Sequence, residues 1–484
     1  MNVRQAAISP VIVWFRDDLR LADNPALAAA VQAHQPVVCL YVLDERSAGL
    51  RHRIGAARWW LAGSLRALGK SLRDIGGLLV LRRGAAAEIV PALARSLGAS
   101  AVHWNRRYDR AGIEADAAVA AAIEAFGAKV ATFQANLLFE PEETPPRVFT
   151  PFWRRVLAGK PPRRPLPAPL RLESPRDVPG DALEDWGLEP TKPDWAIGLR
   201  ATWTPGEAAA RARLEDFIDR QLAGYAGKRD RPDDDATSRL SPYLRSGEIS
   251  PFQLWHAAQF ATEQEPRLAR DVEKFLSELG WREFSYRLLH GFPDLATRNL
   301  QKRFDAFPWR DDAKALRAWQ RGRTGYPIVD AGMRQLWRTG WMHNRVRMVA
   351  ASFLVKHLLT DWRSGEQWFW DTLVDADPAN NPASWQWVAG CGADAAPYFR
   401  IFNPVLQGEK FDPDGRYVRA YVPEFARLPD DVIHQPWTAP PLVLESAGVR
   451  LGETYPLPIV DHAQARQRAL AAFARLQDAE SSSR

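Results

Sequence analysis

Short apolar segments alternate with helical segments through the first third of the chain, and this alternation constrains the fold more than any other feature of the sequence. The apolar segments are rich in β-branched residues and cover 11–15, 37–43, 78–82 and 101–104. Segments rich in Ala, Leu and Arg separate them at 56–75, 85–98 and 113–126. Strands that alternate with helices in this way pair in parallel. The pattern therefore predicts an α/β domain at 9–137, built on a doubly wound parallel sheet.

The rest of the chain changes character twice. Residues 138–206 are rich in proline and lack periodicity, so they are expected to form a long interdomain linker that lies on the surface. From 207 to 484 apolar residues recur at helical spacing, which predicts an all-helical second domain. The segments with this spacing are 207–224, 251–262, 267–290, 312–320, 329–339, 343–359 and 462–477.

The composition excludes several kinds of site. Cys39 and Cys391 are the only cysteines, which excludes all-cysteine zinc sites and a four-cysteine iron–sulfur cluster and makes a disulfide framework unexpected. No metal site is predicted. No G-x-G-x-x-G follows the first strand, so a nicotinamide site has no support. The formal charge of +6 is compatible with a polyanionic partner, although many basic proteins have none.

The sequence contains no sign of a membrane location. Charge appears too early in 1–21 for a signal peptide, and no apolar run approaches the length of a membrane span. Few cysteines also suit a reducing compartment. We therefore expect a cytoplasmic protein.

Two segments of the second domain indicate a large ligand. Residues 323–416 place tryptophans beside Asn, Asp and Arg, and such polar groups need matching partners if they are buried. A flat, polar, redox-active cofactor would supply these partners. Upstream, Thr237, Ser238 and Ser241 lie just before and at the start of a predicted helix, where hydroxyls and free N–H groups can bind an anion. Simple N-capping is the ordinary alternative for these hydroxyls.

Two further sets of side chains share helix faces. Glu278, Trp281 and Arg282 are spaced i, i+3 and i+4, so they lie on one face of a helix. They could bind a ligand, or they could be a surface ion pair beside a core tryptophan. Asn344 and Met348 share a face in the same way. The amide of Asn344 offers a donor and an acceptor, which matches the edge of an adenine or a pyrimidine.

These motifs resemble those of the DNA photolyase and cryptochrome family, and the resemblance extends over nearly the whole chain. It is weakest at 140–206 and after 430. The segments that carry it are FRDDLRLADNPAL (15–27), GYAGKRDRPDDDATSRLSPYLRSGEIS (224–250), SELGWREFSYRLLH (277–290) and WFWDTLVDADPANN (368–381). The resemblance implies an α/β antenna domain, a linker and an all-α FAD-binding catalytic domain.

The resemblance also implies the residues that bind FAD. Arg347 and Asp375 would form an ion pair near the flavin, Asp377 would contact the ring, and Asn381 would face its reactive nitrogen. Plant cryptochromes tend to carry Asp at the position of Asn381. An Asn cannot give up a proton at neutral pH, so it favours an anionic reduced flavin. The implied FAD ligands are Tyr225, Thr237, Ser238, Arg239, Leu240, Ser241, Phe275, Arg347, Asp375, Asp377 and Asn381.

For the substrate, the resemblance implies a cyclobutane pyrimidine dimer. Glu278 would hydrogen-bond to a carbonyl of the damaged base, and Trp281 would pack against the dimer. The (6–4) photolyases carry histidines where Asn344 and Met348 stand, and single-strand-specific cryptochromes usually carry Tyr where Trp387 stands. The implied contacts to UV-damaged DNA are Arg229, Glu278, Trp281, Arg282, Asn344, Arg345 and Gln407.

Three tryptophans match the family's electron-transfer chain, and the antenna site departs from one of the family's patterns. By resemblance, Trp385 would lie nearest the flavin, followed by Trp362 and then Trp309, although core packing is the ordinary role of any tryptophan. Ala111 and Gly112 stand where folate-binding class I enzymes carry an Asn-Glu pair. The motifs SELGWREFSYRLLH and WFWDTLVDADPANN are more similar to those of class III bacterial photolyases, so the resemblance implies 5,10-methenyltetrahydrofolate as the antenna, in a different pose.

The resemblance therefore implies a light-driven lyase that repairs cyclobutane pyrimidine dimers by electron transfer from reduced FAD to the flipped-out dimer. The expected protein is a monomer of the bacterial cytoplasm, associated with the nucleoid when it binds DNA. One alternative is a cryptochrome-type photoreceptor without repair activity, but such receptors often extend well beyond the FAD domain or lose the pair formed here by Glu278 and Trp281. A plain flavoprotein oxidoreductase is the second alternative, and it would need the missing nicotinamide motif.

Overall fold

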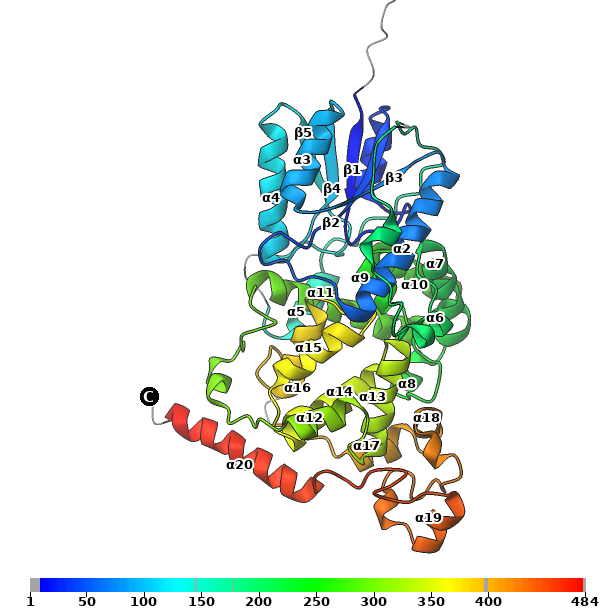
Figure 1. Ribbon diagram of the computed structural model, residues 1–484, viewed down its shortest axis with the longest axis vertical. Coiled ribbons are helices and arrows are strands. Elements are labelled where there is room, and N and C mark those ends of the chain that lie inside the picture. Colours follow the sequence, from blue (N-terminus) through cyan, green and yellow to red (C-terminus); the bar gives the residue numbers. More distant parts are fainter. Residues whose placement is uncertain (1–8, 143, 145, 176, 396–398, 482–484) are drawn as a thin grey trace, which may run out of the picture. The chain divides into compact units, whose positions relative to one another are not determined.

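The computed structural model describes residues 9–142, 144, 146–175, 177–395 and 399–481 (Figure 1). The described parts of the chain form two compact units. The first combines the chain up to 145 with 150–223 and 238–293, and the second combines 146–149, 224–237 and 294–484. Several helices beyond 207 thus group with the sheet. The domain boundaries at 137 and 206 remain a prediction.

The first unit contains a parallel sheet of five strands in the order β3-β2-β1-β4-β5, which confirms the predicted doubly wound fold. Val11 pairs with Val37 on one side and with Ala101 on the other, so β1 lies at the centre. The fifth strand was not predicted from the sequence, because its KVATF segment lies at an edge and is only partly buried. The strands are β1 Val11–Phe15, β2 Val37–Leu43, β3 Leu79–Arg83, β4 Ala101–Asn105 and β5 Lys129–Phe133.

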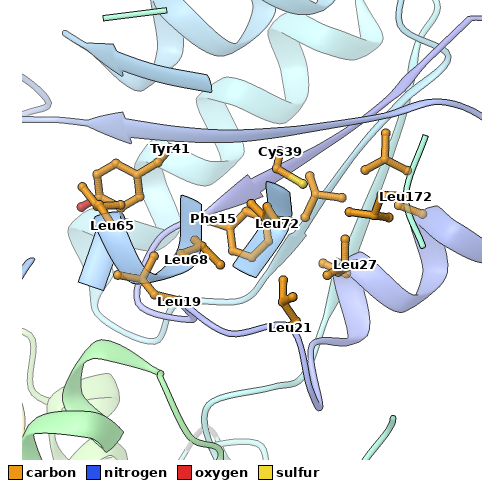
Figure 2. Close-up of a cluster of buried hydrophobic side chains, with 14 of the residues drawn as sticks. Phe15, Leu19, Leu21, Leu27, Cys39, Tyr41, Leu65, Leu68, Leu72 and Leu172 are labelled. Atoms are coloured by element: carbon orange, nitrogen blue, oxygen red, sulfur yellow. The ribbon is translucent and has the colours of Figure 1, made fainter. Parts of the chain in front are cut away.

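Alternate residues of the strands point into two hydrophobic clusters, because side chains of a strand project to opposite faces. Phe15 faces a cluster that includes Leu27 of α1 (Pro25–Gln32) and Leu68 of α2 (Gly55–Asp74), as Figure 2 shows. Trp14 faces the other cluster, with residues of α3 (Ala86–Ser96) and α4 (Arg110–Glu124). Helices therefore cover both faces of the sheet, as a parallel sheet requires.

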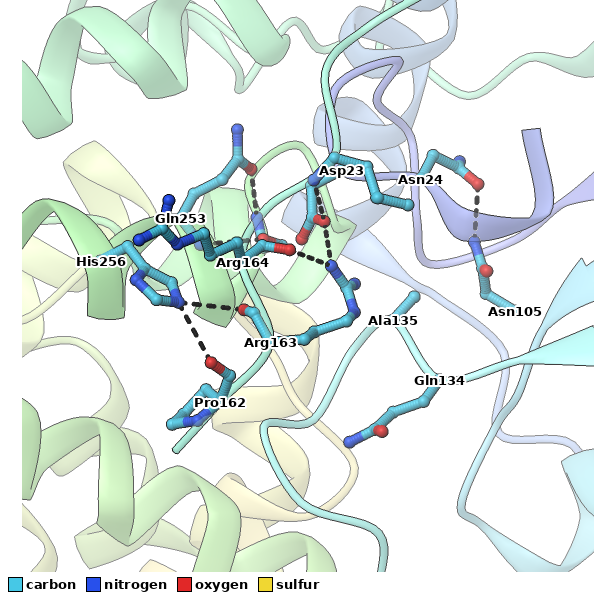
Figure 3. A network of polar contacts seen from close by, with 12 residues as sticks. Asp23, Asn24, Asn105, Gln134, Ala135, Pro162, Arg163, Arg164, Gln253 and His256 are labelled. Carbon is cyan, nitrogen blue, oxygen red and sulfur yellow. Dashed lines mark hydrogen bonds and ion pairs between the residues drawn. The ribbon is translucent and has the colours of Figure 1, made fainter. Parts of the chain in front are cut away.

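The predicted linker is more closely integrated than a surface segment. Leu172 and Trp186 are buried in the same cluster as Phe15 (Figure 2 labels Leu172). His256 of α10 (Pro251–Gln264) donates to the backbone oxygens of Pro162 and Arg163, and Arg163 pairs with Asp23 (Figure 3). The segment contains α5 Phe149–Leu157, the 3-10 turn η1 Leu183–Trp186 and α6 Ile197–Thr202. The expectation of a segment that merely lies on the surface was therefore wrong for these buried residues.

The remainder of the chain is helical, as predicted, apart from one isolated bridge in the described residues. The remaining helices of the first unit are α7 Glu207–Asp216, η2 Phe217–Gln221, α9 Ser241–Ser246, α10 Pro251–Gln264, η3 Pro266–Leu268 and α11 Ala269–Gly291. Those of the second unit are α8 Tyr225–Lys228, η4 Lys302–Ala306, α12 Ala313–Gln320, α13 Pro327–Thr339, α14 Asn344–Ser352, η5 Phe353–His357, α15 Trp362–Thr372, α16 Asn380–Ala389, α17 Pro404–Phe411, α18 Arg416–Tyr421, η6 Pro423–Phe425, η7 Pro436–Thr438, α19 Pro441–Ala447 and α20 His462–Ser481.

The described residues contain neither a membrane-spanning helix nor a cluster of metal ligands. None of the helices there is both long enough and apolar enough to cross a membrane. No group of three or more His, Cys, Asp and Glu side chains in that part of the chain is arranged to hold a metal ion.

Candidate functional site

Helix α11 of the first unit carries the predicted Glu278, Trp281 and Arg282 on one face. Glu278 is half-buried and forms an ion pair with Lys274 one turn earlier, with 2.8 Å between Nζ and Oε1. Trp281 is also half-buried and packs edge-on against Phe284, with ring centroids 5.6 Å apart. A carboxylate and an indole therefore lie side by side on a helix face that solvent can reach.

Arg282 has a different environment from its two neighbours. It is only 9% exposed, and its Nη1 donates to the backbone oxygen of Asn136 at 2.7 Å. The same guanidinium lies 3.4 Å from the Glu283 carboxylate and 4.9 Å from the ring centre of Tyr286. These contacts hold the segment after β5, so the structure gives Arg282 a structural role. Its contact with DNA remains a prediction.

The loop before α9 and the first residue of that helix carry the serines expected to bind an anion. The residue at the N-cap of α9 is Leu240, which cannot accept a hydrogen bond through its side chain, so hydroxyl N-capping does not explain Ser241. Ser238 accepts a hydrogen bond from Arg213 through its backbone oxygen at 2.8 Å. Arg239 has a φ of 50°, which is uncommon for a residue with a side chain. The backbone is thus held in an unusual conformation here.

In the second unit, Arg347 and Asp375 form the predicted ion pair. Arg347 Nη2 lies 2.8 and 3.1 Å from the two carboxylate oxygens of Asp375, and Nε donates to the backbone oxygen of Met342 at 2.7 Å. Asp375 is only 7% exposed. A carboxylate buried this deeply needs such a partner. The pair joins α14 to the segment before α16.

Asp377 lies just before α16, and Asn381 lies in the first turn of that helix. Asp377 accepts hydrogen bonds from the backbone N–H groups of Ala379 and Asn380, at 2.9 and 2.7 Å, and so fixes the start of α16. Asn381 is buried and donates through Nδ2 to Glu366 of α15. Sequence reasoning did not identify Glu366. Glu366 lies at helical spacing from Trp362, Phe369 and Trp370, on the buried face of α15. A charged residue within such an apolar pattern could have indicated a buried side chain that needs a polar partner.

The three predicted electron-transfer tryptophans lie in the second unit but in different surroundings. Trp385 lies one turn after Asn381 in α16 and packs against Trp319 and Phe369, with centroid distances of 6.1 and 5.0 Å. Trp362 is fully buried, and its Nε1 donates to Asn299 at 2.9 Å. Trp309 is half-buried and packs against Phe307 at 4.4 Å. The three tryptophans therefore differ in burial, and the electron route among them remains a prediction.

The remaining predicted residues of the second unit are more exposed. Trp387 is half-buried, and its Nε1 donates to the backbone oxygen of Asp394 at 3.0 Å. It borders a cavity of about 140 Å³ that is also lined by Lys356 and Phe399. Asn344 is exposed and Met348 is half-exposed on α14, one turn apart. These side chains remain accessible to a partner.

Four further residues belong to the set predicted for FAD and DNA. Phe275 is buried and packs against Phe217 in the first unit, with ring centroids 4.8 Å apart. Tyr225 is 5% exposed and lies beneath the guanidinium of Arg229, 5.5 Å from the ring centre. Gln407 is half-buried on α17. The structure thus gives Phe275 and Tyr225 packing roles and leaves Gln407 partly accessible.

Comparisons with known proteins all indicate the same family. The family model of the DNA photolyase domain matches residues 11–170, and that of the FAD binding domain of DNA photolyase matches 275–475. A deoxyribodipyrimidine photo-lyase of Agrobacterium fabrum is 54% identical, and the alignment covers 96% of this chain and 98% of that protein. Cryptochrome-1 of Arabidopsis thaliana is 40% identical, over 98% of this chain and 71% of that protein.

A solved structure is similar over the full length. The crystal structure of a bacterial class III photolyase from Agrobacterium tumefaciens superimposes with a TM-score of 0.95 at 52% sequence identity. The match covers 99% of this chain and 100% of that chain.

Proposed function

Because the chain belongs to the DNA photolyase and cryptochrome family, we propose that it is a light-dependent deoxyribodipyrimidine photo-lyase. Its substrate is the cyclobutane pyrimidine dimer in UV-damaged DNA. The observation that carries this proposal is the half-buried pair of Glu278 and Trp281 on one face of α11. A protonated carboxyl group can donate a hydrogen bond to a base carbonyl, while the indole beside it stacks against the base.

The chemistry of the second unit fits FAD. The carboxylate of Asp375 balances the charge of Arg347, so a polar ring beside the pair meets no uncompensated charge. Asn381 directs its amide nitrogen to Glu366, which leaves Oδ1 for a donor such as a flavin N–H. FAD would supply the absorption of blue light and the one-electron redox chemistry. Its proposed ligands are Tyr225, Thr237, Ser238, Arg239, Leu240, Ser241, Phe275, Arg347, Asp375, Asp377 and Asn381.

The protein's own groups bind and position the damaged DNA. Arg229 and Arg345 contact backbone phosphates, which supply most of the affinity for DNA of any sequence. The dimer leaves the duplex, and its poor stacking makes this step less costly than for an intact base. In its protonated form, Glu278 then donates a hydrogen bond to a base carbonyl and stabilises the negative charge that the dimer acquires. We propose that Trp281, Asn344, Met348 and Trp387 contact the dimer and that Arg282 and Gln407 contact the DNA.

A folate antenna also belongs to this proposal, and one location has physical support. Ligands of doubly wound sheets bind where the strand order reverses, which here is at the carboxyl ends of β1 and β4. Arg16 and Arg107 follow these two strands, and their guanidinium groups lie 4.3 and 5.7 Å from the ring centre of Trp14. Among the described residues, Nε and Nη1 of the buried Arg16 have no hydrogen-bond partner. The carboxylates of 5,10-methenyltetrahydrofolate would supply one.

A repair assay tests the function directly. The purified protein, with its flavin chemically reduced, should restore an oligonucleotide that contains one thymine cyclobutane dimer under blue light and leave it unchanged in the dark. An oligonucleotide with a (6–4) product should stay unrepaired. A photoreceptor of the cryptochrome type would bind FAD and leave both lesions intact, and that result would overturn the proposal. We further propose that the protein acts as a monomer in the bacterial cytoplasm and joins the nucleoid when it binds DNA.

A further inference from the structure

Asp230 lies between the two arginines that are proposed to contact DNA phosphates. Its Oδ2 is 2.6 Å from Nη2 of Arg345, and its Oδ1 is 4.0 Å from Nε of Arg229. The side chains differ in exposure: 40% for Asp230, 20% for Arg345 and 10% for Arg229. The carboxylate is therefore the most accessible of the three charged groups. A phosphate that approaches the arginines meets Asp230 as well.

Both arginines are also supported by aromatic rings in the second unit. The guanidinium of Arg345 lies 4.4 Å from the ring centre of Phe411, and that of Arg229 lies 5.5 Å from the ring centre of Tyr225. Cation–π contacts of this kind hold a guanidinium plane in place. Each arginine is thus held between a ring and the shared carboxylate of Asp230, in a pose that is fixed before any DNA binds.

A carboxylate and a phosphate compete for the same guanidinium groups. Both are anions that bind the N–H groups of arginine in the same geometry. Two arginines and one aspartate have a formal charge of +1, whereas the two arginines alone would have +2. Asp230 thus lowers the positive potential that attracts DNA while it keeps the arginines positioned.

This opposition affects damaged and undamaged DNA differently. Undamaged duplex is bound through phosphate charge alone, so its affinity follows the local potential closely. Damaged DNA is also held by the extruded dimer, which keeps its phosphates in close contact with the two arginines. A phosphate that binds both arginines closely also benefits from their fixed pose, and preorganisation lowers the cost of forming such contacts. Loss of Asp230 should therefore favour undamaged DNA more than damaged DNA.

We propose that Asp230 is a specificity-determining residue that suppresses binding to undamaged DNA and so raises the preference for the lesion. The inference rests on the proposed function, because it assumes that Arg229 and Arg345 contact phosphates. It assigns to Asp230 the role of weakening the attraction of the protein for undamaged DNA. Specific binding often depends on such an unfavourable element against the wrong partner.

The experiment compares Asp230→Asn with the parent protein in darkness, so that bound dimers are not repaired during the measurement. Fluorescence anisotropy gives Kd for matched duplexes with and without one cyclobutane dimer, over a range of salt concentrations. For undamaged duplex we expect binding to tighten roughly fivefold and the log–log salt slope to steepen by about 0.9. For damaged duplex we expect a smaller change, so the ratio of Kd for undamaged duplex to Kd for damaged duplex falls.

Asp414→Asn is the matched control. Asp414 is an exposed carboxylate 3.7 Å from Arg231 and 3.8 Å from Arg416, so its loss changes the net charge by the same unit beside two other arginines. The control should leave the ratio of Kd values unchanged. An equal gain on both duplexes in Asp230→Asn, no gain on either, or the same fall in ratio in Asp414→Asn would overturn the inference.

A third variant separates this inference from the proposed function. Arg345→Ala should weaken binding to both duplexes, since it removes a phosphate contact. If Arg345→Ala binds as the parent does, the phosphate role is wrong and the inference about Asp230 is overturned with it. Repair of the dimer by the parent protein would still establish the function in that case. A parent protein without any preference for the lesion would overturn the function itself.

Discussion

Asn381 donates through its side-chain nitrogen to two oxygens of Glu366, the carboxylate Oε1 at 2.8 Å and the backbone oxygen at 3.0 Å. An amide nitrogen has two hydrogens, so both are used and Oδ1 faces away from Glu366. The contact with Glu366 therefore orients the amide of Asn381 so that its oxygen, and not its nitrogen, is available to another partner. If Asn381 faces the flavin as proposed, Glu366 makes it an acceptor for the N–H of the reduced ring.

This relationship predicts the redox behaviour of the flavin. In Glu366→Ala the amide loses one of its two acceptors and can turn its nitrogen toward the ring, which favours the oxidised flavin. We expect the midpoint potential of bound FAD to fall by about 30 mV, the equivalent of one net hydrogen bond. Glu366→Gln keeps an acceptor oxygen and should leave the potential near that of the parent. Spectroelectrochemical titration measures both, and an unchanged potential in Glu366→Ala would show that the contact has no influence on the flavin.

Glu278→Ala tests the substrate pocket. The carboxyl group is proposed to bind the lesion and not the flavin, so the variant should retain FAD while the repair yield per absorbed photon falls roughly tenfold, as expected for one lost hydrogen bond to a developing charge. Lys274→Ala is the control, because it removes the ion-pair partner of Glu278 and leaves the carboxyl group in place. Normal repair by Glu278→Ala, or loss of its FAD, would contradict the role assigned to this residue.

Local patterns were sufficient to predict the elements whose periodicity is strong. The spacing at 251–262 and 329–339 predicted helices that the structure contains as α10 and α13, with small changes at their ends. Helices α15 and α16 were not predicted as such, because tryptophan, Asn and Pro in these segments conceal the apolar spacing. Their helical form depends on tertiary packing, such as the close approach of Gly365 to the ring of Trp385, where an added Cβ would clash with the ring.

Contacts between residues that are far apart in the sequence could not be predicted from local patterns. The ion pair of Arg347 with Asp375 was expected only through the family resemblance and is confirmed by the structure. The contacts of Glu366 with Asn381 and of Asp230 with Arg345 join segments 15 and 115 residues apart, and no periodicity links such positions. Whether the proposed ligands bind FAD and DNA stays a prediction, because residue type and spacing do not record which partner a side chain meets.

Two buried histidines predict a loss of stability in acid. Burial lowers the pKa of His357 to about 3 and that of His343 to about 4. The unfolded chain takes up protons near the ordinary value of 6.5, so the unfolded state binds more protons and folding stability falls as pH decreases below that value. Each group should cost about 2 kcal/mol of stability by pH 5.

His357→Phe isolates one of these contributions. The phenyl ring can keep the stacking on Phe353, whereas the hydrogen bond to His462 is lost, so some stability is lost at pH 7. The further loss between pH 7 and pH 5 should be smaller than in the parent protein by about 2 kcal/mol. Comparison of the two proteins is needed because burial raises the pKa of Glu248 to about 8. Protonation of Glu248 therefore stabilises the folded protein as pH falls, which opposes the effect of the histidines. Denaturant unfolding at both pH values measures the difference, and parallel pH curves would exclude His357 as the cause.

The tryptophan chain makes a prediction that separates electron transfer from packing. A flavin oxidised in air must be reduced before repair, and transfer from solvent to a buried ring is slow without relay groups. Trp309 is the half-buried member of the proposed chain and packs against Phe307, so Trp309→Phe keeps an aromatic ring and removes the easily oxidised indole. Photoreduction under blue light with an external reductant should be blocked or strongly slowed. Repair should be normal once the flavin is reduced chemically.

Trp362→Phe should behave in the same way, with some additional loss of stability because Nε1 of Trp362 donates to Asn299 inside the protein. Trp319→Phe is the informative comparison. The ring centroids of Trp319 and Trp385 are 6.1 Å apart, but Trp319 is not part of the proposed chain. It should photoreduce at the parent rate. If Trp309→Phe and Trp362→Phe photoreduce normally while Trp319→Phe does not, electrons leave Trp385 through Trp319, and Trp309 and Trp362 serve only in packing.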